Sequence, residues 1–179
     1  ELDQASGNKA REEALRAYFA SAKAADASWA IYVLSGGKIN AGKNRIAKTK
    51  ELRAWVGKLV DLPDWVVDDC YRQVGDLAET LALLVEAGHT VVPQPRSASD
   101  GQIQRRLPND DDTLQEWIES FLLPVAQEVE SIRQLAMQSA WLALSAWPRF
   151  VFNKLLTGSL RVGVSKRMLQ NSLAPLVGI

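Results

Sequence analysis

The sequence contains a single cysteine and a single histidine among its 179 residues. Cys70 has no partner for an internal disulfide, which fits a reducing cytoplasm. His89 follows Cys70 by 19 residues, and the two side chains cannot assemble a metal site between them. No apolar run approaches the ~20 residues of a transmembrane helix, and no basic segment opens the chain as in a secretory signal. The sequence therefore argues against a disulfide-stabilised fold, a Cys/His metal centre and a membrane-spanning helix.

The charge of the chain is balanced overall but unevenly distributed. The formal net charge is zero, with 21 basic and 21 acidic residues. Residues 36–53 contain six basic residues and one acid, and residues 131–179 contain six basic residues and no acid. Residues 54–92 and 93–130 each carry a net charge of −5. Because the local field rather than the net charge steers a charged partner, the two basic segments are the places to search for a polyanion site.

Apolar residues recur at helical spacing through most of the chain. The clearest stripe covers residues 114–122, with apolar side chains at i, i+3, i+4, i+7 and i+8. Thr49, Asp76 and Ser165 each stand where they can cap a helix. Three prolines and many small polar residues predict a long loop near residues 89–112. We expect an all-α domain of about eight to ten helices in two linked bundles, with helical halves over residues 1–88 and 113–179.

Several residues that could suggest a site are better explained by structure. The six tryptophans lie in helical segments, so we expect them in the core; Trp65, Trp117 and Trp141 could stack on bases only if the bases were unpaired. The basic stretch after Gly36 is expected to be a loop that does not pack, and no alternating pattern predicts a strand of convincing length. Capping and solvation explain the remaining carboxylates better than metal binding does, namely Asp68, Asp69, Asp76, Glu79 and the run Asp110–Asp112.

The most informative segment is residues 153–166, Asn-Lys-Leu-Leu-Thr-Gly-Ser-Leu-Arg-Val-Gly-Val-Ser-Lys. A predicted helix ends there, a loop with two glycines follows, and a new helix begins at Ser165. Glycine allows the backbone to approach a ligand closely, and a helix N-terminus presents free N–H groups and a positive dipole end. Hydroxyl and basic side chains supply further phosphate ligands. The segment is suited to binding phosphate, although a plain helix-loop-helix corner would show the same glycines.

This segment resembles the Leu-(Ser/Thr)-Gly-X-(Leu/Phe)-Arg-(Ile/Val)-Gly signature that closes the DNA-binding domain of ATP-dependent DNA ligases. Three earlier segments are similar to the bacterial branch of that family, in the same order along the chain. They are Trp29-Ala-Ile-Tyr-Val-Leu-Ser-Gly-Gly-Lys38, Glu51-Leu-Arg-Ala-Trp55 and Val74-Gly-Asp-Leu-Ala-Glu-Thr-Leu81. The resemblance thus covers most of the chain and implies that residues 1–179 are an all-helical DNA-binding domain.

The resemblance implies that the domain holds nicked duplex DNA from its minor-groove side, through the sugar-phosphate backbone. The expected partners are this DNA and the adenylation and OB-fold domains of the same parent chain. A second contact region, the basic loop after Leu34, is argued from its charge. The candidate DNA-binding residues are Lys154, Thr157, Gly158, Ser159, Arg161, Gly163, Ser165 and Lys166 from the signature, and Lys38, Lys43, Arg45 and Lys48 from the basic loop.

The covalent chemistry of a ligase is not expected in this chain. The family's nucleophile is the lysine of a Lys-X-Asp-Gly motif, but Ala98 stands in that place before Asp100-Gly101. There is also no Walker-type phosphate loop. We expect no catalytic residue and no cofactor here, with ATP and Mg used by a parent DNA ligase in the bacterial cytoplasm, at the nucleoid. A chain that starts at Glu1 and stops at Ile179 is expected to be a piece of that longer protein.

Two other functions are alternatives to DNA binding. A helical interaction scaffold whose basic patches meet an acidic partner would fit the zero net charge. A helix-turn-helix regulator would need a recognition helix with Arg, Asn and Gln gathered on one face, and no such helix is evident. Duplex DNA preference separates the first alternative from the ligase interpretation, since a scaffold would not distinguish duplex DNA from other polyanions.

Overall fold

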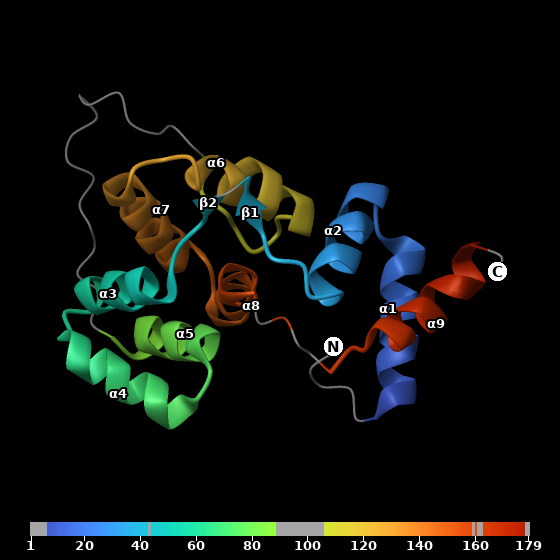
Figure 1. Cartoon of the computed structure of the whole chain (residues 1–179), viewed down its shortest axis with the longest axis horizontal. Coiled ribbons are helices and arrows are strands. Elements are labelled where there is room, and N and C mark those ends of the chain that lie inside the picture. The colour runs from blue at the N-terminus through green and yellow to red at the C-terminus, as the bar shows by residue number, and fades with distance from the viewer. Residues whose placement is uncertain (1–6, 43, 89–105, 159, 161–162, 178–179) are drawn as a thin grey trace. The chain divides into compact units, whose positions relative to one another are not determined.

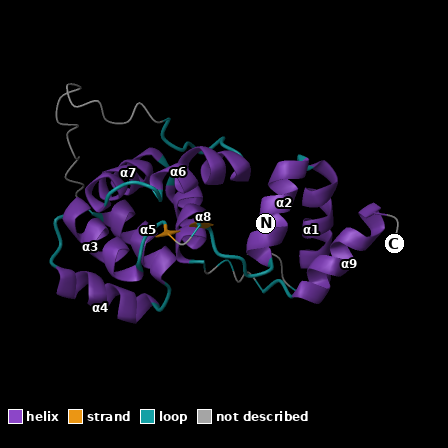
Figure 2. Ribbon diagram, turned by 45° about the horizontal axis from the view of Figure 1, so that its top comes forward, coloured by secondary structure: helices purple, strands orange, loops and turns teal. Residues whose placement is uncertain are grey.

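The computed structural model describes residues 7–42, 44–88, 106–158, 160 and 163–177. Helices dominate this part of the chain, as the sequence predicts, and the strands are very short (Figures 1 and 2). The elements in chain order are α1 (Asn8–Ser21), α2 (Ala24–Leu34), β1 (Asn40–Ala41), β2 (Asn44–Arg45), α3 (Thr49–Leu59), α4 (Asp64–Val74), α5 (Leu77–Ala87), the π-helix η1 (Glu116–Leu122), α6 (Leu123–Val125), α7 (Glu130–Ala143), α8 (Ala146–Thr157) and α9 (Lys166–Val177). The all-α class is confirmed.

The chain forms two compact units that are not the expected sequence halves. Unit 1 consists of residues 1–38 and 158–179, and unit 2 consists of residues 39–157. Helices from both sides of the expected 89–112 loop share the core of unit 2, because α5 packs along α8. The Pro-rich segment marks a gap in the sequence pattern, whereas packing decides which helices belong to the same unit. Residues 89–105 lie outside the described part of the chain.

The core of unit 2 combines apolar packing with a few buried polar side chains. Trp55 on α3 and Trp141 on α7 are buried, and so is Phe152 on α8. Asn153, also fully buried, accepts a hydrogen bond from Trp141 Nε1 at 2.8 Å and donates to the backbone oxygen of Ala78 at 3.3 Å. Buried polar groups are costly unless they are hydrogen-bonded. Asn153 therefore fixes α8 against both α5 and α7.

Unit 1 is a smaller bundle in which α1 packs on α9 and α2 contributes a third face. Leu15 and Phe19 of α1 are buried, as are Met168 and Leu169 of α9. The hydroxyl of Ser172, also buried, lies 3.4 Å from the backbone oxygen of Glu12. This pairing joins the first helix of the chain to its last helix, which are about 150 residues apart in sequence.

Two of the three predicted helix caps are confirmed. The Asp76 carboxylate accepts a hydrogen bond from Glu79 N at 3.0 Å, and the Ser165 hydroxyl accepts one from Met168 N at 3.1 Å. The expected cap at Thr49 is wrong, because Thr49 is already the first residue of α3 and Lys48 precedes the helix. There the Glu51 carboxylate accepts a hydrogen bond from Lys48 N at 2.6 Å. A side chain inside the first turn thus satisfies the donor, which is one half of a capping box.

The basic stretch after Gly36 packs more closely than expected. Asn40 pairs with Arg45 and Ala41 with Asn44 in a short antiparallel hairpin. Ile39 and Ile46, which flank this hairpin, are buried, as is Ala47. The expectation of a non-packing loop is therefore wrong, because two isolated isoleucines at the base of a polar turn are enough to anchor it in a core.

The six tryptophans differ in burial, and Trp29 is half-buried. Trp55, Trp117 and Trp141 are buried as expected, but Trp65 is 71% exposed and Trp147 is 51% exposed. The expectation of a core position is therefore wrong for both Trp65 and Trp147. Trp65 occupies the first turn of α4, and Val67, two residues later and on the opposite face of the helix, is the residue that is buried.

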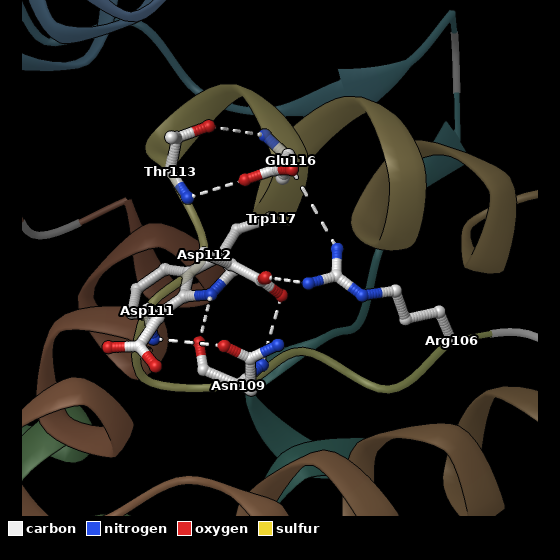
Figure 3. A network of polar contacts seen from close by, with 7 residues as sticks. All are labelled: Arg106, Asn109, Asp111, Asp112, Thr113, Glu116 and Trp117. Carbon is white, nitrogen blue, oxygen red and sulfur yellow. Dashed lines mark hydrogen bonds and ion pairs between the residues drawn. The ribbon is translucent and has the colours of Figure 1, made fainter.

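Asp111 and Asp112 of the acidic run join a polar network directly before η1 (Figure 3). Asp112 pairs with Arg106 and accepts a hydrogen bond from Asn109 N at 3.0 Å. The helix itself is capped by Thr113, whose N–H donates to Glu116 at 2.8 Å and whose hydroxyl accepts from Glu116 N at 3.3 Å. Asp110 caps a different helix, because it accepts a hydrogen bond from Ser145 N at 3.0 Å directly before α8. Hydrogen bonding to Ser145 lowers the pKa of Asp110.

Candidate nucleic-acid interface

Lys154, which lies in α8 of unit 2, already has an ionic partner. Its ammonium lies 2.6 Å from the Asp76 carboxylate and 5.0 Å from the centre of the Phe150 ring. The Lys154 side chain is only 16% exposed. A phosphate that binds Lys154 would have to compete with Asp76, so Lys154 is a weaker candidate contact than its place in the signature suggests.

Asp76 is held in its ionised form by these surroundings. Partial burial raises the pKa of its carboxyl group, but the hydrogen bond and charge of Lys154, with the backbone N–H groups at the start of α5, more than offset this. The net effect is a lowered pKa. Asp76 therefore caps α5 and neutralises Lys154 at the same time.

Thr157 ends α8, and its hydroxyl lies 3.0 Å from the backbone oxygen of Asn153. The next residue, Gly158, has a φ of +66°, a left-handed conformation that favours glycine. This geometry confirms the expected helix end at Gly158. The hydroxyl that the signature offers to phosphate is thus bonded to its own helix.

In unit 1, Gly158 lies against Lys38. A Cβ atom added at Gly158 would stand 3.3 Å from Lys38 Cγ. The hydroxyl of Tyr32 donates a hydrogen bond to the backbone oxygen of Lys38 at 2.9 Å and so holds that backbone in place. Lys38 and Gly158 came from two separate candidate segments, and the fold places them side by side.

Gly163 makes a second close contact with a basic side chain. Its φ is +68°, and a Cβ atom at this position would stand 2.8 Å from Nη1 of Arg11 and 3.1 Å from its Cζ. Ser165 caps α9 two residues later, and Lys166 is exposed in the first position of that helix. The predicted contacts Ser159 and Arg161 lie outside the described residues.

Arg11 is the residue of this region that sequence reasoning missed. It lies in α1, whose sequence contains no local binding motif, about 150 residues before Gly163. No sequence signal connects the two positions. The contact exists because α1 packs on α9, which is a tertiary event.

The hairpin region in unit 2 presents Arg45 and Lys48 on the surface, both exposed. Lys43 lies outside the described residues. Arg133 of α7 holds the base of the hairpin by donating to the backbone oxygen of Ile46 at 2.9 Å and pairing with Glu51 at 3.2 Å. Its guanidinium also stands 5.8 Å from the centre of the Trp55 ring. Arg133 thus stabilises the base of the hairpin, although it belongs to the acid-free segment at residues 131–179.

The carboxylates of Asp68 and Asp69 are engaged with basic side chains. Asp68 pairs with Arg53 at 2.5 Å, and Asp69 pairs with Arg72 at 2.9 Å. A search over the described residues finds no cluster of three or more His, Cys, Asp or Glu side chains arranged to hold a metal. Within the same residues, none of the helices combines the length and apolar character needed to cross a membrane.

Comparison with known proteins agrees with the resemblance seen in the sequence. A family model described as DNA ligase N terminus matches residues 1–174. This range includes all of the candidate residues in both basic regions. Comparison with individual curated proteins finds no match.

Proposed function

Because this chain belongs to the family of N-terminal domains of ATP-dependent DNA ligases, we propose that it binds nicked double-stranded DNA through the sugar-phosphate backbone. In this role it positions the nick for the catalytic domains of its parent enzyme. The observation that carries the proposal is the start of α9, where Lys166 and Arg167 are exposed and form no ion pair with any described residue. Exposed cations at a helix N-terminus are a ready anion-binding arrangement.

The proposed mechanism uses positioning rather than covalent chemistry. Backbone N–H groups at the start of α9 and the basic side chains beside them bind phosphate oxygens of the DNA. The exposed cations Arg45 and Lys48, in and after the hairpin, bind other phosphates of the DNA. Contacts to phosphate carry no base information, so we expect binding without sequence preference. The released counterions make such binding strongly dependent on salt.

The same proposal assigns the ligation reaction to other domains of the parent enzyme. The adenylation and OB-fold domains of the parent chain would carry out ligation with ATP and Mg, in DNA replication, repair or recombination at the bacterial nucleoid. This chain has no Lys-X-Asp-Gly lysine with which to form an AMP adduct. We therefore expect the 179-residue chain alone to bind DNA without joining it.

A titration of the chain against a fluorescein-labelled nicked duplex, followed by anisotropy at several salt concentrations, tests the proposal. Replacing Arg161 and Lys166 together by Ala is expected to weaken binding at least tenfold and to reduce the slope of log K against log salt by about 2, because each neutralised phosphate contributes about 0.9. The matched control is Lys58→Ala with Arg72→Ala, which removes the same charge from exposed positions in unit 2. This control is expected to change affinity less than about twofold.

Two results would overturn the proposal. One is the absence of binding to nicked duplex at low salt. The other is equal affinity for heparin and for duplex DNA, with the two double variants indistinguishable. The second result would favour a scaffold that binds an acidic partner.

A further inference from the structure

The side chain of Arg11 occupies a space that only glycine leaves open. Its guanidinium lies over the backbone of Gly163, where a Cβ atom would stand 2.8 Å from Nη1. Real Cβ atoms do not approach a neighbour so closely, so any side chain at position 163 would displace the guanidinium. The position also has a φ of +68°, which disfavours other residues independently. Gly163 thus seats Arg11 within unit 1.

The guanidinium of Arg11 has unsatisfied hydrogen-bonding capacity. Its Nε is buried and has no hydrogen-bond partner. Arg53 in unit 2 has a similarly buried Nε, but its Nη1 pairs with Asp68 at 2.5 Å. Arg11 forms no ion pair with any described residue. Because Arg11 is only half-buried, the Nη groups of its guanidinium, which have no carboxylate partner among the described residues, are the donors that an anionic ligand would meet.

The neighbouring elements of unit 1 favour an anion at this place. Gly163 stands three residues before Lys166, the first residue of α9. The first N–H groups of a helix have no partner within the helix, and here the Ser165 hydroxyl takes the N–H of Met168 and leaves the earlier ones. Lys166 and Arg167 add two positive charges. A phosphate diester, with two acceptor oxygens, matches a guanidinium fork beside free N–H groups.

We propose that Arg11 binds a phosphate of the DNA backbone at the start of α9, as a contact outside the signature segment. The inference rests on the proposed function, since it names a further residue of the same DNA-binding surface. Arg11 reaches the phosphate because Gly163 seats its guanidinium. The glycine of the signature therefore serves a side chain from α1, in addition to opening the loop.

Arg11→Gln, measured by anisotropy on the nicked duplex, tests this assignment. Loss of one charged, bidentate contact is expected to weaken binding about tenfold and to reduce the salt slope by about 1. The matched control is Arg16→Gln, which removes the same charge from an exposed position on the same helix, rotated away from Arg11 by about 140°. Arg16→Gln is expected to change affinity less than about twofold.

Two more variants separate binding from a structural role. Arg11→Lys keeps the charge and loses the fork, so it is expected to restore the salt slope while recovering only part of the affinity. Gly163→Ala displaces the guanidinium, which is the flexible end of its side chain, and is expected to weaken binding by less than Arg11→Gln does. The double variant is expected to be no weaker than Arg11→Gln alone, because both changes act on the same contact. Circular dichroism and thermal unfolding of each variant report whether unit 1 still folds.

The outcomes are distinct for the two proposals. If the unsubstituted chain does not bind nicked duplex, the proposed function fails. If it binds, and folded Arg11→Gln and Arg11→Lys bind as tightly as Arg16→Gln with an unchanged salt slope, the assignment of Arg11 is overturned while the proposed function stands. Additive losses in the double variant would overturn the seating of Arg11 by Gly163.

Discussion

The basic side chains of the two units are used in different ways. In unit 2, Arg53, Arg133, Arg149 and Lys154 each pair with a carboxylate, and Arg133 and Arg149 also donate to backbone oxygens of neighbouring segments. In unit 1, Arg11, Lys166 and Arg167 have no carboxylate partner among the described residues. A paired and largely buried cation is costly to remove because its carboxylate is left uncompensated, whereas a cation without a partner is available to a ligand.

This difference changes how the acid-free segment 131–179 is interpreted. The segment contains six basic residues and no acid, so the sequence alone suggests that all six charges are available. Arg133, Arg149 and Lys154 obtain their carboxylates from Glu51, Glu86 and Asp76, all far away in the chain. The local count therefore overstates the charge available for DNA, because the fold supplies acids from the negatively charged segments.

The largest loss of stability is expected on replacing Arg149. This variant tests whether the cations of unit 2 stabilise the fold. Arg149 is buried and donates hydrogen bonds of 2.7 Å to the backbone oxygens of Trp141 and Leu144 at the end of α7. Arg149→Met is expected to lower the free energy of unfolding by about 3–5 kcal/mol, because buried carbonyl groups lose their donors. Urea unfolding measures this loss, and Arg72→Met, at an exposed ion pair, is the control with an expected change below about 1 kcal/mol. An equal effect of both variants would show that the buried Arg149 contributes no more to stability than an exposed ion pair does.

A smaller loss of stability is expected on replacing Arg133. This variant tests whether Arg133 acts on the hairpin alone or on all of unit 2. Arg133→Met removes the hydrogen bond to Ile46, the ion pair with Glu51 and the ring contact with Trp55. We expect a loss of about 2–3 kcal/mol of stability and faster amide hydrogen exchange in residues 39–48 than in α5. Uniform exchange changes over the whole of unit 2 would show that Arg133 does not act locally on the hairpin.

The ion pair of Asp76 and Lys154 gives a pH-dependent test of the same comparison. Asp76→Asn keeps a good helix cap and removes the charge, so it is expected to cost about 1 kcal/mol at neutral pH. Because the folded pKa of Asp76 lies below its unfolded value, the ionised carboxylate stabilises the fold at neutral pH, and this contribution is lost as the pH falls through the folded pKa. The stability difference between the two proteins is thus expected to shrink in acid. A difference that stays constant with pH would contradict the ion pair's contribution.

The smallest effect is expected at the hairpin surface, where unit 2 does expose cations. Arg45→Gln is expected to weaken binding to nicked duplex about two- to threefold and to reduce the salt slope by no more than about 1. Lys50→Gln, exposed on α3 just beyond the hairpin, is the matched control. If anisotropy titrations give the same affinity for Arg45→Gln and Lys50→Gln, the DNA contact is restricted to unit 1.

Much of the fold was predictable because it depends on short-range pattern. Helical periodicity located the helices, and Asp76, Gly158 and Ser165 marked helix ends that the structure confirms. These features depend on residues within one or two turns of each other. Trp65 and Ile46 were misjudged for the opposite reason, since their exposure depends on which segments pack nearby.

The sequence by itself determined the all-α class, the signature segment at residues 153–166 and the family, because local spacing and residue type are enough for these. Only the tertiary structure decided which cations are available. It paired Lys154 with Asp76, drew Arg133 into the hairpin base and seated Arg11 on Gly163. The physical reason is that ion pairing and close packing act between side chains that are near in space, and the chain brings together residues that are up to about 150 positions apart.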